Sequence, residues 1–139
     1  MISRGEGLLN RTWNEEVRVR ARNAITDYLL ADRVCIAATR VRRAIGLIGR
    51  SGLPDGEALW IVPSRGVHTW GMRFAIDLLA LDETGRVIDL VADLKPWRMR
   101  LPKEGCVGVL ELSAGAIYRS GTRLGDVIVF EVVNDSVTD

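Results

Sequence analysis

The chain has 139 residues, a length that suits one domain rather than two, and its 47% hydrophobic and 27% charged residues are typical of a globular protein. Its formal net charge of +1 gives no global field that would draw it to nucleic acid or to an anionic membrane. Residues 1–50 hold ten arginines against five carboxylates, but a preference for arginine along a whole chain is weak evidence for a site.

The N-terminal part of the chain predicts an arm followed by two strands. Residues 1–13 are polar and contain glycine, so we expect a flexible N-terminal arm. Apolar residues alternate with arginine over 17–21, which is the pattern of a strand with one wet face. A second strand is expected over 28–37, after a break at 23–27.

The next segment predicts the main helix, over about residues 39–50. Thr39 is suited to the N-cap position, and Val41, Ile45 and Ile48 then recur at the spacing of one helical stripe. Gly49 follows as a stop signal.

Downstream, the sequence is typical of short strands joined by turns. Residues 82–85, Asp-Glu-Thr-Gly, predict a hairpin loop, and the prolines at 96 and 102 exclude regular structure from most of 94–105. Ser113 is a candidate cap for a short helical turn that reaches Arg119. Strands are expected over 58–62, 67–72, 76–81, 86–92, 107–112 and 127–133.

These elements predict an α+β fold that is mostly β. We expect an antiparallel sheet or partial barrel of seven to eight short strands with the one main helix. The single globular domain would cover residues 14–133, followed by a tail over 134–139. No apolar run reaches the length of a membrane helix or of a signal peptide, and Cys35 and Cys106 resemble small buried hydrophobic residues. The expected compartment is the cytoplasm.

An unusual group of side chains lies between residues 67 and 77. It includes the only histidine, His68, followed by Trp70, Met72, Arg73 and Asp77. In an extended chain the first three share one face, which would form an aromatic surface with a titratable tip. The alternative is a core histidine that bonds to backbone beside ordinary packing aromatics.

Two carboxylates lie in apolar strands and need partners. Asp77 shares a face with Leu79 and Leu81, and a buried carboxylate without a partner is costly. Arg73, Arg43 and a backbone turn are each candidates to pair with it. Glu111 lies in the strand before Ser113, where it could cap the following turn. Asp126 is most simply a turn residue.

Common catalytic and ligand-binding templates do not match. The chain has no GxSxG, HExxH, Walker or GxGxxG motif, so no cofactor is expected. With one histidine, a zinc site is not expected either. Four arginines at 40, 42, 43 and 50 lack interleaved aromatics, which argues for a solvated surface rather than a nucleic-acid interface.

Several of these segments, taken in order, resemble the uncharacterised family numbered 192 among the domains of unknown function. The resemblance covers about residues 30–132, with Ile48 where methionine is usual and Ala75 where proline is usual. It implies a compact β-rich domain with one helix, and it implies no reaction. The segments that carry it are Arg43 to Arg50 (resembling RxxGLMxR), Ala58 to Pro63, His68 to Asp77, Leu110 to Gly115, and Gly121 with Gly125-Asp126.

The hypothesis that the sequence favours is a binding or accessory module for an anionic small molecule or a peptide. Its site would be the His68–Asp77 surface, with Arg43, Trp70, Met72 and Arg73, completed by Trp97-Arg98. One alternative is a small hydrolase or lyase in which His68 is the general base, oriented by Asp77 or Glu111. Another is a purely structural interaction domain. Neither nucleic acid nor membrane is an expected partner, and the sequence does not determine the oligomeric state.

Overall fold

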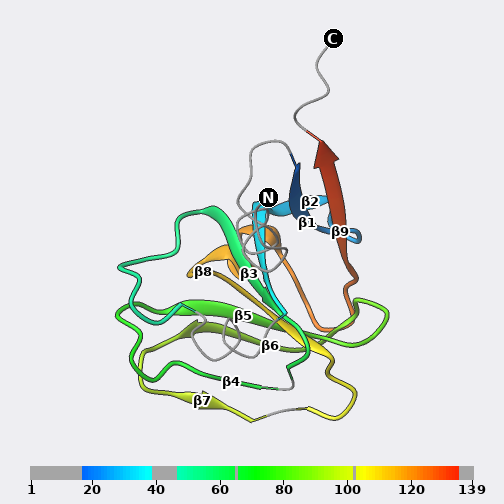
Figure 1. The fold of residues 1–139 in the computed structure, drawn as a ribbon. Helices are drawn as coiled ribbons and strands as arrows, with labels where there is room; N and C mark the ends of the chain where they lie inside the picture. Colours follow the sequence, from blue (N-terminus) through cyan, green and yellow to red (C-terminus); the bar gives the residue numbers. More distant parts are fainter. Residues whose placement is uncertain (1–16, 39–46, 65, 102, 135–139) are drawn as a thin grey trace.

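The computed structural model describes residues 17–38, 47–64, 66–101 and 103–134. Within these ranges the chain forms nine strands and one short helix (Figure 1). The elements are β1 Val17–Asn23, β2 Tyr28–Ala37, β3 Gly56–Ile61, β4 Val67–His68, β5 Ile76–Leu81, β6 Val87–Leu94, β7 Met99–Arg100, β8 Gly108–Ser113, α3 Ala116–Ser120 and β9 Ile128–Asn134.

Seven of the strands form one sheet, in the order β6-β5-β8-β3-β2-β1-β9, and β4 and β7 form a separate two-stranded ribbon. In the described residues the neighbouring strands run antiparallel except for β2 and β3, which are parallel. A parallel pair needs a crossover rather than a hairpin. The chain between Ala37 and Gly56 is long enough to provide one.

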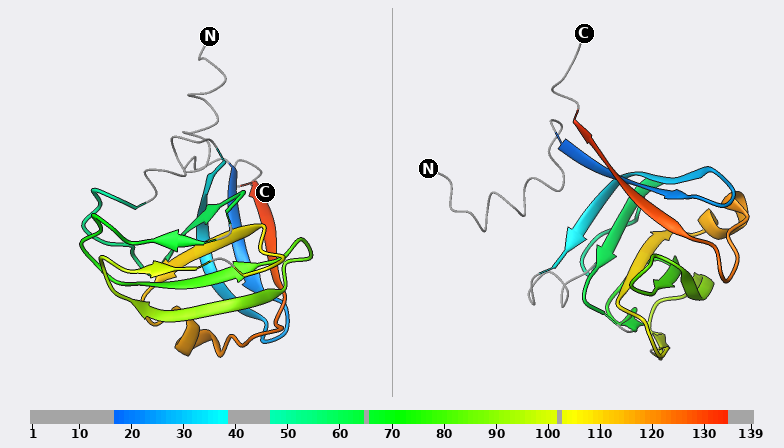
Figure 2. Two further views of the ribbon diagram at one scale, coloured as in Figure 1. Left: turned by 90° about the horizontal axis from the view of Figure 1, so that it is seen from below. Right: turned by 90° about the vertical axis from the view of Figure 1, so that its right-hand side faces the viewer.

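The seven-stranded sheet is strongly curled (Figure 2). At one corner its two edges approach each other, because the start of β6 bonds to the segment that leads into β9. The amide of Val87 donates to the carbonyl of Asp126 at 2.8 Å, and the amide of Ile128 donates to the carbonyl of Gly85 at 2.8 Å. The strands β6 and β9 do not pair, so the sheet does not close into a barrel.

Both faces of the sheet carry a hydrophobic core, which explains why β5 and β8 are buried at every position. One core includes Leu79, Leu110 and Ile117 of α3, so the helix covers this face. The other core includes Leu59 and Leu78, and it is covered by segments outside the sheet that contribute Leu47, Leu53, Met72 and Cys106. A strand covered on both faces is expected to be apolar at successive positions.

The mostly β fold expected from the sequence is confirmed. The strand expected over 28–37 has the observed bounds, as does the strand over 76–81. Cys35 and Cys106 are buried, as expected, and neither forms a disulfide bond. Two expectations differ from the structure: the strand expected over 67–72 ends at His68, and β7 lies in the segment 94–105 that the two prolines were expected to keep irregular.

The expected main helix lies largely outside the described residues. Of its residues only 47–50 are described, and 47–49 form a turn in which the amide of Arg50 donates to the carbonyl of Leu47 at 3.2 Å. The expected arm over 1–13 also lies outside them, and so does the expected tail except for Asn134, which ends β9.

Candidate functional site

The ribbon of β4 and β7 ends in a turn that exposes His68 and Trp70. The strand β4 stops because residues 69–72 form a turn, in which the amide of Met72 donates to the carbonyl of Thr69 at 3.1 Å and Gly71 has a φ of +82°. The indole of Trp70 is 47% exposed, and its ring centroid lies 5.0 Å from that of His68. The two rings therefore form an aromatic pair on the surface.

The segment opposite this turn exposes a second tryptophan in an unusual backbone conformation. Trp97 is 66% exposed and has a φ of +62°, a left-handed conformation that a bulky side chain rarely adopts. Such strain persists only where the surrounding structure enforces it, and it is concentrated at functional sites. Met99 and Leu101, which follow at alternate positions, are 54% and 70% exposed.

Thr69 is the residue that holds the two segments together. Its hydroxyl donates to the carbonyl of Lys95 at 2.6 Å and accepts from the amide of Arg98 at 2.8 Å. Its own amide donates to the carbonyl of Arg98 at 2.8 Å, and its carbonyl accepts from the amide of Trp97 at 3.1 Å. Because Thr69 is fully buried, these bonds fix the backbone that carries Trp70 and Trp97.

A bidentate ion pair attaches the ribbon to the main sheet. Nε and an Nη atom of Arg100 in β7 donate to the two carboxylate oxygens of Asp89 in β6, at 2.8 and 2.7 Å. The hydrogen bond from Arg100 holds the pKa of Asp89 below its ordinary value. Paired guanidinium and carboxylate groups with this geometry are stronger than neutral hydrogen bonds and fix orientation.

The exposed side chains of the ribbon form a cationic and aromatic surface. We call it the ribbon surface; its described members are His68, Trp70, Arg73, Trp97, Arg98, Met99 and Leu101. Lys95, Arg100 and Lys103 lie in the same segments, but Lys95 pairs with Asp93 at 2.6 Å and Arg100 with Asp89, which leaves Arg73, Arg98 and Lys103 without an ion pair among the described residues, against one carboxylate, Glu104. This excess contrasts with the net charge of +1 for the whole chain.

Asp77 lies away from the ribbon surface and binds backbone amides. Its carboxylate accepts from the amide of Asp93 at 2.9 Å, from that of Gly115 at 3.2 Å and from that of Ile117 at 2.8 Å. The side chain is fully buried in β5. Of the candidate partners, the backbone turns are therefore the ones that satisfy Asp77. Its geometry is that of a structural carboxylate that holds α3 and the β6 bulge at Asp93.

The other predicted site residues are dispersed. Met72 is buried in the core between the sheet and its cover, so it has no place on an exposed surface. Arg73 is exposed, and Arg43 lies outside the described residues. Glu111 is 2% exposed in β8. Its cross-strand partners Leu59 and Leu78 belong to the core on the sheet face opposite to that of Asp77.

Two observations weaken the enzyme alternative. No hydrogen bond involves the His68 ring among the described residues, so no described carboxylate orients it as a base. Asp77 and Glu111 lie on opposite faces of the sheet, so they do not converge with His68 on one cleft. In the described ranges, no group of three or more His, Cys, Asp or Glu side chains could hold a metal ion.

The ribbon residues Met99 and Leu101 and the pair Asp89–Arg100 were not foreseen. The signal for the ribbon was present in the sequence, since Trp97, Met99 and Leu101 alternate with arginines as in a half-buried strand. The strand was not predicted, because Pro96 and Pro102 flank this segment and argue against regular structure. Nothing in the sequence marks Thr69 as a bonding centre, because its partners are set by the tertiary structure.

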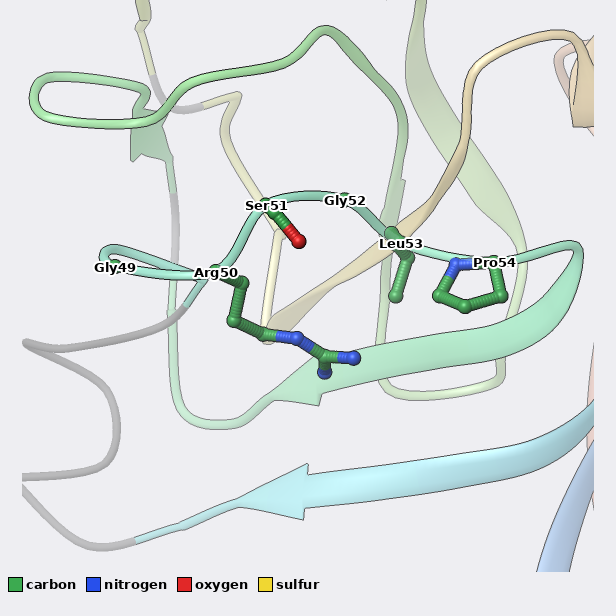
Figure 3. Close-up of a pocket in the computed structure, with 6 residues that line it drawn as sticks. All are labelled: Gly49, Arg50, Ser51, Gly52, Leu53 and Pro54. Carbon is green, nitrogen blue, oxygen red and sulfur yellow. The ribbon is translucent and has the colours of Figure 1, made fainter.

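A second feature is a hollow of about 580 Å³ in the connection between β2 and β3 (Figure 3). Residues 49–54 line it, and the side chain of Arg50 runs from it toward β3, where it pairs with Glu57 at 3.3 Å.

In the described residues, no helix has the length and apolar composition of a membrane span.

Comparison with known proteins identifies the family. The family model described as "Uncharacterized ACR, COG1430", domain of unknown function 192, matches residues 21–130. The chain belongs to this family. It is 32% identical to a UPF0127 protein of Thermococcus sibiricus over 72% of this chain and 67% of that one, and 29% identical to a UPF0127 protein of Pyrococcus furiosus over 86% and 93%.

Solved structures show that the fold of this domain of unknown function 192 is shared. A protein of unknown function from Novosphingobium aromaticivorans superposes with a TM-score of 0.70 at 21% identity, covering 81% of this chain and 83% of that one. A Sinorhizobium meliloti protein with the provisional description of a transcription regulator gives a TM-score of 0.71 at 21% identity, over 82% and 92%. At this identity the likeness concerns the fold alone.

We predict that Asp77→Ala destabilises the protein more than His68→Ala. Removing the carboxylate leaves three backbone N–H groups without their acceptor, at a cost of about 3 kcal/mol, whereas an exposed histidine contributes well under about 1 kcal/mol. Urea unfolding of both variants measures the difference. An equal or larger loss for His68→Ala would contradict the structural role of Asp77.

We also predict that Glu111→Gln changes the pH dependence of stability. Burial raises the pKa of Glu111 from 4.5 to about 8, so the folded protein keeps a proton that the unfolded chain loses near pH 4.5. The contribution of the protonated carboxyl group to the free energy of unfolding is fully present below pH 4.5, and it is lost as the pH rises through about 8. Glutamine cannot titrate, so its contribution does not change with pH. The free energy of unfolding of Glu111→Gln, measured relative to that of the parent, should therefore increase by about 2 kcal/mol from pH 6 to pH 8. Urea unfolding at both pH values tests this, with the exposed Glu104→Gln as control; an unchanged difference would refute it.

Proposed function

We propose that this domain is a binding module whose ribbon surface holds an acidic, extended segment of a partner protein. The observation that carries the proposal is the pair of exposed tryptophans, Trp70 and Trp97, on a backbone that Thr69 holds in a strained, fixed conformation. The proposal concerns a binding role and includes no reaction.

Exposed tryptophans on a rigid frame suit recognition because they supply a large apolar area at small entropic cost. A free surface gains little from an exposed indole, but a partner that covers it recovers the full benefit of burial. Tryptophan and arginine are the residue types most enriched among binding hot spots, and Arg98 directly follows Trp97.

The charge of the ribbon favours an anionic partner. Arg73, Arg98 and Lys103 are exposed in the same segments as the aromatic side chains, and planar guanidinium groups bind carboxylates bidentately. Complementary charge raises the association rate and selects the partner more than it raises affinity.

The extent of the ribbon surface favours a peptide segment over a small molecule. From Met99 to Leu101 the backbone is extended over roughly 7 Å with an exposed apolar side chain at each end, and the exposed Trp97 precedes this stretch in a turn. An extended peptide also presents every second side chain to the same side, so acidic residues at alternate positions would follow the ribbon with the same two-residue repeat.

We predict that Trp97→Ala weakens binding of an acidic peptide at least tenfold, because it removes a hot-spot side chain. The probe is a fluorescein-labelled decapeptide that alternates glutamate with leucine, titrated by fluorescence anisotropy. Tyr118→Ala is the matched control, since Tyr118 is 91% exposed on α3 and lies outside the ribbon. Equal binding of the glutamine version of the peptide, tighter binding of a single-stranded oligothymidine, or equal loss in the control would each refute the proposal.

We further predict that Thr69→Val weakens the same binding about as much as Trp97→Ala, although Thr69 is buried and touches no ligand. Valine keeps the shape but removes the hydroxyl that bonds to the backbone of Lys95 and Arg98. Thr69→Ser keeps the hydroxyl and should retain affinity within about threefold. Near-UV circular dichroism, which reports the tryptophan environments, should change for valine and not for serine. If Thr69→Val retains full affinity, the fixed ribbon is not required.

A further inference from the structure

Glu111 is an ionisable group that the ribbon surface does not use. It lies in β8 near the middle of the seven-stranded sheet, between Leu59 of β3 and Leu78 of β5. It is 2% exposed, and its Oε2 atom has no hydrogen-bond partner among the described residues. A buried polar atom without a partner costs roughly 1–3 kcal/mol and requires an explanation.

The cover above Glu111 contains the hollow of the β2–β3 connection. Leu47 and Leu53, which flank the glycine-containing turn, pack in the same core as Leu59 and Leu78. The hollow is open beside its glycines, since a Cβ atom added at Gly49 or at Gly52 would meet no atom within 4 Å. A small molecule entering here would approach the sheet face on which Glu111 lies.

One carboxylate of that sheet face already pairs with a cationic side chain that lines the hollow. The guanidinium of Arg50 pairs with Glu57 of β3 at 3.3 Å. Glu57 lies two residues before Leu59, the cross-strand neighbour of Glu111, so the two carboxyl groups project from the same face at diagonal positions of adjacent strands. One of them has a cationic partner, and the other has none within the described residues.

We propose that Glu111 is the anion of a second, interior binding site for a small organic cation, an amine or a guanidine, which enters through the hollow lined by residues 49–54. The site is independent of the ribbon surface. An apolar surrounding of leucines suits the carbon chain of such a ligand, and the carboxylate of Glu111 would receive its N–H donors.

Binding at this site releases a proton. Burial, with no countercharge among the described residues, raises the pKa of Glu111 to about 8, so below that pH the neutral acid is favoured before the ligand enters. When the cation binds, the O–H bond of Glu111 breaks, the proton passes to the buffer, and the resulting carboxylate pairs with the ligand, which keeps its own charge.

The test is isothermal titration calorimetry of the full chain with butylamine and with butylguanidine, in two buffers of different ionisation enthalpy. The expected result is binding that releases about one proton per ligand below the pKa of about 8 and that strengthens about tenfold per pH unit from pH 6 to pH 7. Butyrate and butanol are the matched ligands without a positive charge, and they should not bind.

Two variants keep the outcome interpretable. Glu111→Gln preserves the neutral, hydrogen-bonding form of the side chain, so it should fold, and it should abolish both binding and proton release. Gly52→Leu fills the hollow at a position where the backbone is unstrained, and it should weaken binding at least tenfold with Glu111 intact. Binding without proton release, binding that survives in Glu111→Gln, or no binding of either cation in the millimolar range would overturn the proposal. So would a carboxyl signal showing Glu111 already ionised at pH 7 without ligand, because one of the chain's own arginines or an ordered water would then be its partner.

Discussion

The carboxylate of Asp77 is the interaction on which the arrangement of this domain depends. It is fully buried in β5 and accepts hydrogen bonds from three backbone amides that belong to two other parts of the chain. Two of the amides, those of Gly115 and Ile117, fix the start of α3, which covers one face of the sheet. A short helix without a side-chain cap of its own is thereby capped from a neighbouring strand.

The third amide connects Asp77 to the ribbon. Asp93 has a φ of +55° and lies where the register of β6 against β5 shifts, so it forms part of a β-bulge. The hydrogen bond to Asp77 stabilises this bulge, at which β6 bends before it ends at Leu94. The next residue, Lys95, offers its carbonyl to the Thr69 hydroxyl, and Trp97 follows. The position of the exposed tryptophan therefore depends on a carboxylate in the core, through five residues of backbone.

The sequence predicted the strands better than the site because strand signals are local. The apolar run of β5 and the alternation of β1 depend only on which side chains are adjacent, and both strands were found. Trp70 and His68 were predicted to share a surface, and they do contact each other, but through a turn at Thr69 rather than along a strand. For Asp77 an apolar environment was predicted, with a backbone turn among its candidate partners, but the amides that bind Asp77 and the lack of a partner for Glu111 Oε2 among the described residues could not be predicted, because they depend on which strands become neighbours. The parallel pairing of β2 with β3 likewise depends on a crossover that leaves no local mark.

The pairing of β1 with β9 has a consequence for the way this domain can be joined to other chains. Val17 lies opposite Asn134, so the two outermost described residues emerge side by side (Figure 1). In the same view the ribbon of β4 and β7 lies at the far end of the molecule. Any part of the chain that precedes Val17 or follows Asn134 therefore joins the described fold at one common corner, at the end opposite the tryptophan-bearing ribbon.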